Sequence, residues 1–148
     1  MAVTRLDIGT LHSEARKGLE IAQLVVGSAL TAQACFHHDP PTPAELERAI
    51  EVIEDELMRT RSAGAGDPVL HASGEALRAL AAAAGGADVL SLDTVEQLFQ
   101  RVASESLGNP LARRGLPAGN AFVATLLILR EFMHHGGHTA VRFDDSPH

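Results

Sequence analysis

Tryptophan and tyrosine are absent from the 148 residues, and phenylalanine occurs only five times. The hydrophobic core must therefore consist mainly of Ala, Leu, Val and Ile. Alanine is the strongest helix former and its small side chain lets helices approach closely, whereas strands are rich in aromatic and β-branched residues. The shortage of aromatic residues thus favours helices over a β-sandwich.

Lysine and cysteine are almost missing as well: Lys17 and Cys35 are the only ones, and the net charge is -7. One cysteine cannot form an internal disulfide, and residues 1–10 lack the apolar core of a secretion signal. The acidic balance, with no basic stretch longer than Arg113-Arg114, disfavours nucleic acid and anionic membranes as partners. We expect a cytoplasmic protein that binds neither.

Long hydrophobic runs are scarce too. The longest uncharged run, residues 21–36, has sixteen residues and is interrupted by polar side chains such as Gln23 and Gln33. It is too short and too polar to span a bilayer. Hydrophobic residues (45%) and charged residues (21%) occur in ordinary globular proportions. A chain of this length can bury a core, and we predict a single domain over residues 1–148.

What the sequence does contain is the hydrophobic spacing that is typical of helices. The first and last of the predicted helices are apolar on nearly all sides, and the others have one apolar stripe. Local signals support the second one, because Thr42, Pro43 and Glu45 form a capping box with proline at the first position. The predicted helices cover residues 12–36, 43–59, 70–84, 94–107 and 117–135.

These segments predict an all-α fold, a compact up-and-down bundle of about five helices with two central apolar helices. Val26 and Leu127, in the middle of the two central helices, are expected to be among the most buried residues. Asp93 is the expected N-cap of the fourth helix. Residues 137–148 are expected to form a tail.

A group of histidines is the main candidate for chemistry. In an up-and-down bundle the first and fifth helices end at the same pole, which would bring their terminal side chains together. Imidazole and carboxylate are ligands for zinc, iron or nickel, so a divalent transition metal is a candidate cofactor. The alternative needs no ion, because histidine at a helix C-terminus interacts favourably with the macrodipole and the last free carbonyls. The candidate metal ligands are His37, His38, Asp39, Glu131, His134, His135 and His138.

A second candidate site is Arg113 and Arg114, which precede the fifth helix. The free N–H groups at a helix N-terminus and two guanidiniums could hold a carboxylate or phosphate. The loop lacks a complete phosphate-binding motif, however, and exposed arginines are commonly just solvated.

No complete catalytic motif occurs, so whether the protein is an enzyme stays open. The leading hypothesis is a non-catalytic helical-bundle protein, accessory or regulatory, that acts through protein–protein contact or self-association. A homodimer would bury the apolar sides of the first or fifth helix. The alternative is a small metal-binding bundle, enzyme or sensor, that uses the histidines, and a ligand pocket between the central helices is a third option.

Overall fold

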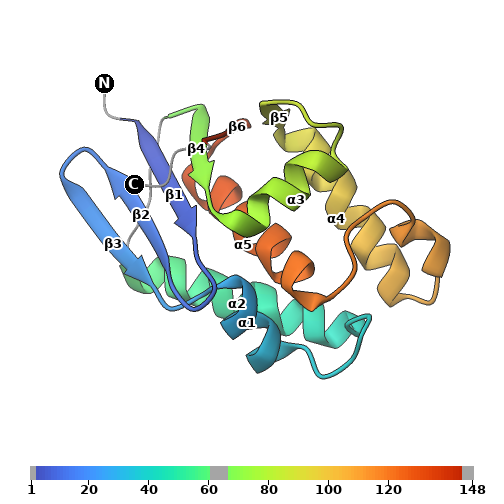
Figure 1. Ribbon diagram of the computed structural model, residues 1–148. Coiled ribbons are helices and arrows are strands. Elements are labelled where there is room, and N and C mark those ends of the chain that lie inside the picture. The colour runs from blue at the N-terminus through green and yellow to red at the C-terminus, as the bar shows by residue number, and fades with distance from the viewer. Residues whose placement is uncertain (1–2, 61–66, 145–148) are drawn as a thin grey trace.

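The computed structural model describes residues 3–60 and 67–144. Within these residues the chain forms a mixed β-sheet with helices packed against it (Figure 1). The strands are β1 Thr4–Ile8, β2 Ser13–Lys17, β3 Glu20–Leu24, β4 Val69–Ser73, β5 Val89–Ser91 and β6 Ala140–Phe143. The helices are α1 Ser28–Cys35, α2 Pro43–Thr60, α3 Glu75–Ala83, α4 Leu92–Ser106 and α5 Asn120–Gly136, with a 3₁₀ turn, η1, at Pro110–Arg113.

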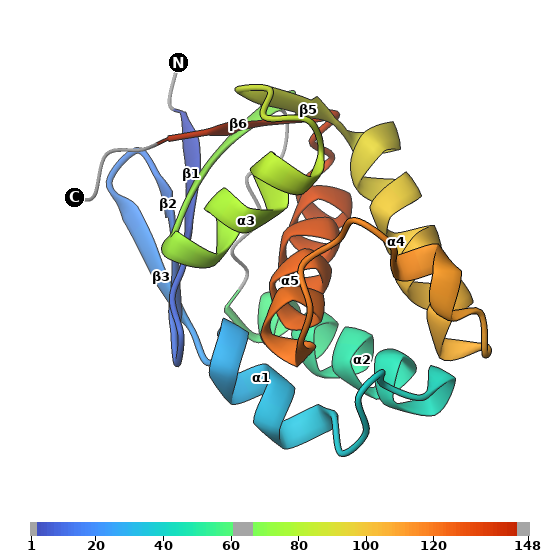
Figure 2. The same ribbon diagram turned by 45° about the vertical axis from the view of Figure 1, so that its right-hand side comes forward.

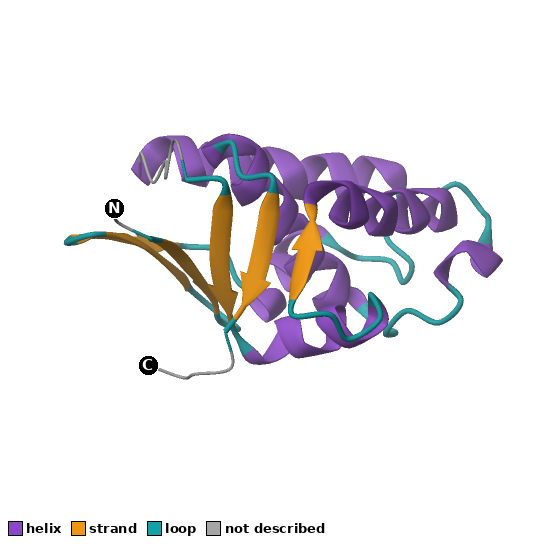
Figure 3. Ribbon diagram, turned by 90° about the horizontal axis from the view of Figure 1, so that it is seen from above, coloured by secondary structure: helices purple, strands orange, loops and turns teal. Residues whose placement is uncertain are grey.

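The six strands are ordered β3-β2-β1-β4-β6-β5. β1, β4 and β6 are parallel neighbours, while β2, β3 and β5 run antiparallel to their partners. The two crossovers, from β1 to β4 and from β4 to β6, step across the sheet in the same direction. Since such crossovers are right-handed, both place their helices on the same face. In Figure 3 the strands accordingly lie in front of the helices.

Burial along the strands follows this one-sided arrangement. In β1, Leu6 and Ile8 are buried beneath the helices, whereas Arg5 and Asp7 alternate with them and are exposed. Leu70 and Ala72 of β4 are buried in the same way. Because side chains alternate between the faces of a strand, the second face of the sheet carries the polar residues.

Helix α5 lies at the centre of the helical layer and contacts α1, α2, α3 and α4 (Figure 2). Its residues 122–129 are all buried, which matches a helix that is apolar on all sides. The prediction that Val26 and Leu127 lie deep in the core is confirmed, since they are 1% and 0% exposed.

The prediction of an all-α bundle is wrong. Residues 12–36 are not one helix but the hairpin of β2 and β3, turning at Gly18 (φ 61°), followed by the short helix α1. Likewise, the predicted helix over residues 70–84 is divided into β4 and α3 at Gly74. The strands are short and contain helix-favouring residues such as Ala, Leu and Arg, so pairing with neighbouring strands is needed to make them extended.

Other local predictions are confirmed. The hydroxyl of Thr42 accepts from the N–H of Glu45, and the Glu45 carboxylate accepts from the N–H of Thr42, which is a capping box at the start of α2. The last predicted helix agrees closely with α5. Helix α4, by contrast, is capped by the Ser91 hydroxyl rather than by Asp93.

The end of the chain also differs from expectation. Residues 140–143, expected to be part of a tail, form β6, which is hydrogen-bonded to β4 on one side and to β5 on the other. Val141 in this strand is fully buried. Within residues 3–60 and 67–144, no helix combines the length and the apolarity needed to cross a membrane.

Candidate functional site

A pocket of about 580 Å³ opens at the carboxyl ends of the parallel strands. In open α/β sheets this edge is where ligands bind, because the loops that leave the strands diverge there. The lining residues come from the ends of β1, β4 and β6 and from the first turns of α1 and α3. They are Asp7, Ile8, Gly9, Thr10, Ser28, Ser73, Gly74, Glu75, Ala76, Arg78 and Asp144.

Two glycines allow the backbone segments around the pocket to approach closely. A Cβ atom on Gly74 would lie 2.3 Å from the carbonyl oxygen of Ile8, and the φ of Gly74 is +130°. A Cβ atom on Gly27 would lie 2.4 Å from the carbonyl oxygen of Thr10. A side chain at either position would clash with backbone, so glycine is favoured where these segments approach Ile8 at the end of β1 and Thr10 just after it.

The N-terminus of α1 is fastened to the turn that follows β1. The N–H groups of Ser28 and Ala29 donate to the carbonyls of Gly9 and Thr10, both at 2.9 Å. These bonds satisfy donors that a helix start otherwise leaves free. The first turn of α1 is therefore a structural support for the Gly9–Thr10 wall of the pocket.

The N-terminus of α3 is different, because its N-cap is Gly74 and no side chain caps it. Glu75 and Ala76, the first two residues of α3, line the pocket. Unsatisfied N–H groups and the positive end of the helix dipole favour an anion such as a phosphate group. Arg78, one turn further along, adds a guanidinium to the same wall.

The pocket is also lined by carboxylates, and neighbouring strands orient two of them. The Ser73 hydroxyl donates to Asp7 Oδ1 at 3.0 Å. Asp144, which follows β6, pairs with Arg5 at 2.8 Å and lies 3.5 Å from His71 Nδ1. Such bonds between adjacent strands hold the carboxylates in defined positions at the pocket.

The lining contains the carboxylates of Asp7, Glu75 and Asp144 but only one guanidinium, that of Arg78. A phosphate group would enter more readily together with a divalent cation, and carboxylates plus phosphate oxygens are the usual ligands of magnesium. Among the residues that the structure describes, no three His, Cys, Asp or Glu side chains are arranged to hold a metal ion by themselves. A cation here would need further ligands, such as water molecules or phosphate oxygens.

The histidines at the end of α1 do not meet those at the end of α5. His38 Nδ1 lies 3.1 Å from Glu45 Oε2, and the His38 carbonyl accepts from Asn120 Nδ2, at the start of α5. The other group, His134, His135 and His138, lies at the end of α5. A helix of 17 residues is about 25 Å long, so the two groups stand at opposite ends of α5.

Instead, several histidines of the two groups make contacts with residues close to them. The exposed His37 donates its backbone N–H to Glu45, and Asp39 is exposed. His134 Nε2 lies 2.7 Å from Glu96, and His135 is exposed. The buried His138 lies with Nδ1 2.6 Å from the Asp67 carbonyl oxygen.

Glu131 belongs to an ion-pair network rather than to a histidine cluster. Its carboxylate pairs with Arg130 at 2.6 Å, and Arg130 pairs with Glu96 at 2.7 Å and lies over the Phe99 ring. Burial raises the pKa of the Glu131 carboxyl, although the nearby Arg130 charge opposes the shift. A cleft of about 200 Å³ beside it is lined by Glu54, Met58, Glu131, His134 and His135.

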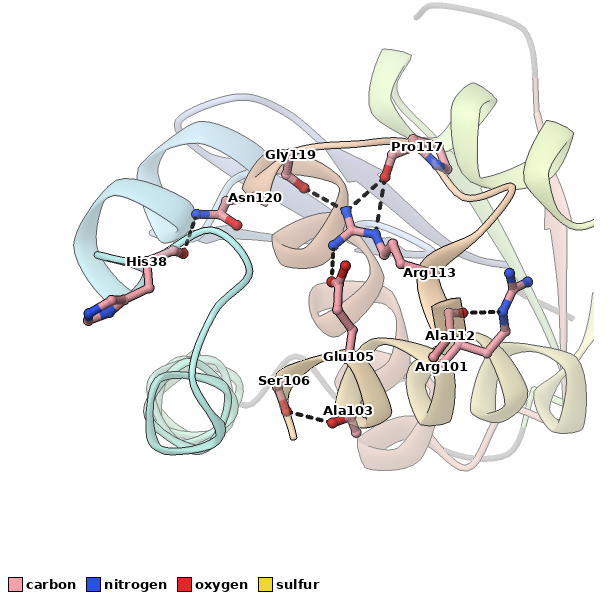
Figure 4. Close-up of polar contacts among 10 residues, drawn as sticks. All are labelled: His38, Arg101, Ala103, Glu105, Ser106, Ala112, Arg113, Pro117, Gly119 and Asn120. Carbon is pink, nitrogen blue, oxygen red and sulfur yellow. Dashed lines mark hydrogen bonds and ion pairs between the residues drawn. The ribbon is translucent and has the colours of Figure 1, made fainter. Parts of the chain in front are cut away.

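Arg113 supports the loop before α5 (Figure 4). Its guanidinium donates to the carbonyls of Pro117 and Gly119 at 2.7 and 2.9 Å and pairs with Glu105 at 2.9 Å. The side chain is only 9% exposed and leaves no face for a ligand. Arg114 is exposed, and its carbonyl accepts from Arg101. The structure therefore does not bring these two guanidiniums together as an anion site.

The residues of the pocket were not found from the sequence. One signal was available: buried Thr4, Leu6 and Ile8 alternate with exposed residues and are followed at once by Gly9. Alternation that ends in glycine is typical of a strand followed by a tight turn. The strand has only five residues, and its charged residues Arg5 and Asp7 made the alternating pattern hard to recognise in the sequence.

The sequence matches no known family and no curated protein. Among solved structures, a Ppx/GppA family member from Aquifex aeolicus has a TM-score of 0.79 at 20% identity over 97% of this chain and 52% of that chain. An exopolyphosphatase-like protein has a TM-score of 0.67 at 13% identity over 98% of this chain and 55% of that one. An exopolyphosphatase from Cytophaga hutchinsonii has a TM-score of 0.64 at 18% identity over 97% of this chain and 53% of that one.

The likeness shows a shared fold. The chain spans about half the length of these structures. The hypothesis of a non-catalytic helical bundle acting through protein contact is wrong, because the chain is an α/β domain with the fold of these phosphatase-like enzymes. The alternative of a small metal-binding bundle fails for the same reason, since the bundle on which it depends is not formed.

Proposed function

We propose that the chain is a phosphate-binding domain of a phosphatase-like enzyme and that its pocket holds the phosphate groups of a phosphorylated substrate. The observation that carries this proposal is the uncapped start of α3 in the pocket, brought against β1 by Gly74. The fold shared with Ppx/GppA phosphatases supports it.

In this proposal the parts of the pocket share the binding and the chemistry. The N–H groups at the start of α3 and the Arg78 guanidinium bind phosphate oxygens. Asp7, oriented by Ser73, accepts the proton of a water molecule that attacks phosphorus while the bond to the leaving group breaks. A divalent cation that accompanies the phosphates would be held by Asp7 or Asp144 and would neutralise part of the charge.

Hydrolysis requires more than this chain in the proposal. The similar structures are about twice as long, and the pocket is not enclosed by the described residues. A second domain would close it and exclude water, which strengthens every electrostatic contact inside. A cytoplasmic location stays a prediction from composition and the missing secretion signal, and self-association stays a prediction from the apolar sides of the predicted first and fifth helices.

The test is isothermal titration calorimetry of the purified chain with inorganic tripolyphosphate, with and without Mg²⁺. We expect binding that is stronger with Mg²⁺ and weaker by about tenfold, or 1.4 kcal/mol, in Arg78→Gln. Asp7→Asn should reduce the effect of Mg²⁺, and Asp7→Asn combined with Asp144→Asn should abolish it. Arg48→Gln, a change of an exposed arginine on α2, is the matched control and should bind like the natural protein.

Two results would count against the proposal. One is an absence of binding with and without Mg²⁺ at millimolar ligand. The other is equal binding by the natural protein, Arg78→Gln and Asp7→Asn, which would place the ligand elsewhere.

A further inference from the structure

Strand β3 forms one edge of the sheet, and no strand lies beyond it among the described residues (Figure 1). Its inner side pairs with β2 in a continuous register, from Ser13 opposite Leu24 to Lys17 opposite Glu20. Strands β2, β1 and β4 lie between β3 and β6, the strand at which the described chain ends. The exposure of this edge is thus set by the strand order of the sheet.

Two residues of β3 present backbone groups on its outer side. Lys17 and Glu20 flank a two-residue turn, so they form a hydrogen-bonded pair, and such pairs alternate with open ones along the hairpin. The N–H and C=O groups of Ile21 and Gln23 therefore point away from β2. They are donors and acceptors that another strand can use.

Apolar side chains are exposed along the same strand. Leu19, at the tip of the turn, is fully exposed, and Ile21 and Val25 are 56% and 53% exposed. Edge strands are commonly protected by lysine, by proline or by a bulge. β3 contains neither lysine nor proline, its register with β2 has no bulge, and Glu20 is its only charged residue. The edge is therefore suited to pairing with another strand.

The sequence of β3 is complementary to itself in one antiparallel register. When Ala22 lies opposite Ala22 of a second copy, Ile21 of each copy lies opposite Gln23 of the other. The outward groups of these two residues then form four hydrogen bonds across the two-fold axis. Leu19 of each copy comes beside Val25 of the other, and no two charged residues face each other. A second copy of the chain thus satisfies both the backbone and the apolar side chains.

Helix α2 and the turn of the hairpin restrict the alternatives to this register. A shift by two residues in one direction would need the N–H of Val25, which already donates to Glu56 of α2 at 2.6 Å. A shift by two in the other direction would pair Gln23 with Leu19, a residue of the turn. The register centred on Ala22 is the one that uses all the free backbone groups of β3.

We infer that two copies of the chain associate through β3, as an antiparallel pair of strands centred on Ala22. The contact is independent of the proposed phosphate site, because Ile21 and Gln23 do not line the pocket. An interface of one strand per copy is smaller than the roughly 1,200 Å² of stable complexes, so we expect a dissociation constant of about 100 µM. The self-association predicted from residues 12–36 is thereby assigned to a strand that these residues form.

Sedimentation equilibrium of the full chain between about 10 µM and 1 mM measures the association. Ile21→Lys introduces a charge at an exposed position of the contact, as in protected edge strands. Gln23→Pro removes an outward N–H that β2 does not use. Leu111→Lys, at a leucine of η1 that is 72% exposed, adds the same charge elsewhere and is the matched control. Circular dichroism verifies that each variant is folded.

We expect the average mass of the natural protein to rise with concentration from 15.6 kDa towards twice that value. Ile21→Lys and Gln23→Pro should weaken the association at least about tenfold, and Leu111→Lys should leave it unchanged. Amide exchange of Ile21 and Gln23 should slow as the concentration of the natural protein increases.

Three results would overturn the inference. One is a monomer at every concentration, even if a strand of another protein were found to pair with this edge. Another is association of Ile21→Lys that is as strong as that of the natural protein. The third is slower amide exchange that appears only outside β3, because the copies would then meet through another surface.

Discussion

The carboxyl edge of the parallel strands and the far end of α5 are built in opposite ways. At the strand edge, small residues and main-chain groups form an open pocket, with Gly74 pressed against β1. At the end of α5, charged side chains pair with one another, as His134 does with Glu96, and the cleft beside Glu131 has only about 200 Å³. The end of α5 has the more conspicuous chemistry in the sequence, but the strand edge has the larger pocket, of about 580 Å³.

This difference teaches that a cluster of reactive side chains is not in itself a site. Arginine and histidine side chains at a helix end can be occupied by nearby carbonyls and carboxylates, as His134 is by Glu96, although His138 Nε2 is buried without a hydrogen-bond partner among the described residues. A site needs groups that the fold leaves unsatisfied. The uncapped start of α3 is such a group, and no residue type in the sequence marks it.

The largest expected effect is that of Gly74→Ala. The new Cβ atom would meet the Ile8 carbonyl at 2.3 Å, and alanine is strained at a φ of +130°. We expect a loss of more than about 3 kcal/mol in the free energy of unfolding, measured by urea denaturation.

Two further glycines separate the effect of the steric clash from the effect of the strained φ angle. Gly27→Ala carries only the clash with Thr10 and should cost about 2 kcal/mol. Gly108→Ala carries only the strained φ of +102°, with nothing within 4 Å, and should cost about 1 kcal/mol. If Gly74→Ala cost no more than Gly108→Ala, the close contact with β1 would not matter.

The next effect concerns the neighbouring arginines before α5. Arg113→Met removes the guanidinium that joins Glu105 to the carbonyls of Pro117 and Gly119, and should cost about 2–3 kcal/mol. Arg114→Met, at an exposed side chain, should stay within about 0.5 kcal/mol of the natural protein. Thermal unfolding of both variants measures the difference, and equal melting temperatures would contradict a supporting role for Arg113.

A smaller effect tests the end of α5 directly. A Cβ atom on Gly136 would lie 2.4 Å from His138 Nε2, so Gly136→Ala should cost about 1–2 kcal/mol. The obstacle here is a side chain, not backbone as at Gly74. In a His138→Ala background the same change should therefore stabilise the helix by up to about 1 kcal/mol. A double-mutant cycle measured by urea denaturation checks this change of sign. If Gly136→Ala changed the free energy of unfolding in the same direction in both backgrounds, the contact with His138 would be excluded.

The smallest effect is a pH dependence that arises from His138. Burial lowers the pKa of its ring below the usual value, whereas the unfolded chain protonates near pH 6.5. The unfolded state then binds more protons in the window below about pH 6.5, so stability is complete above that pH and falls as the pH decreases towards the folded pKa.

The loss should not exceed about 1.4 kcal/mol per pH unit. Unfolding at several pH values should show a shallower dependence in His138→Phe, while His135→Gln, a change of an exposed histidine, should follow the natural protein. If the pH dependence of unfolding were the same in the natural protein and in both variants, His138 would not be its cause.

Some of the structure was determined by the sequence alone. The capping box of Thr42 and Glu45 and the all-round apolar character of α5 were readable because helix bonds join residues within about four positions. For the same reason, the burial of Leu127 followed from its neighbours along the chain.

The sheet and the pocket were decided only by the tertiary structure. In register, Arg5 lies opposite His71 and His71 lies opposite Arg142, so the three parallel strands are specified by partners far along the chain and not by their own few residues. With one face of the sheet open, charged residues occupy alternate positions and conceal the short apolar patterns. The pocket joins the ends of three such strands, and the same topology places the two histidine groups at opposite ends of α5. Pairing between residues far apart in the sequence, which no short window of residues contains, is the physical reason why neither the sheet nor the pocket could be predicted.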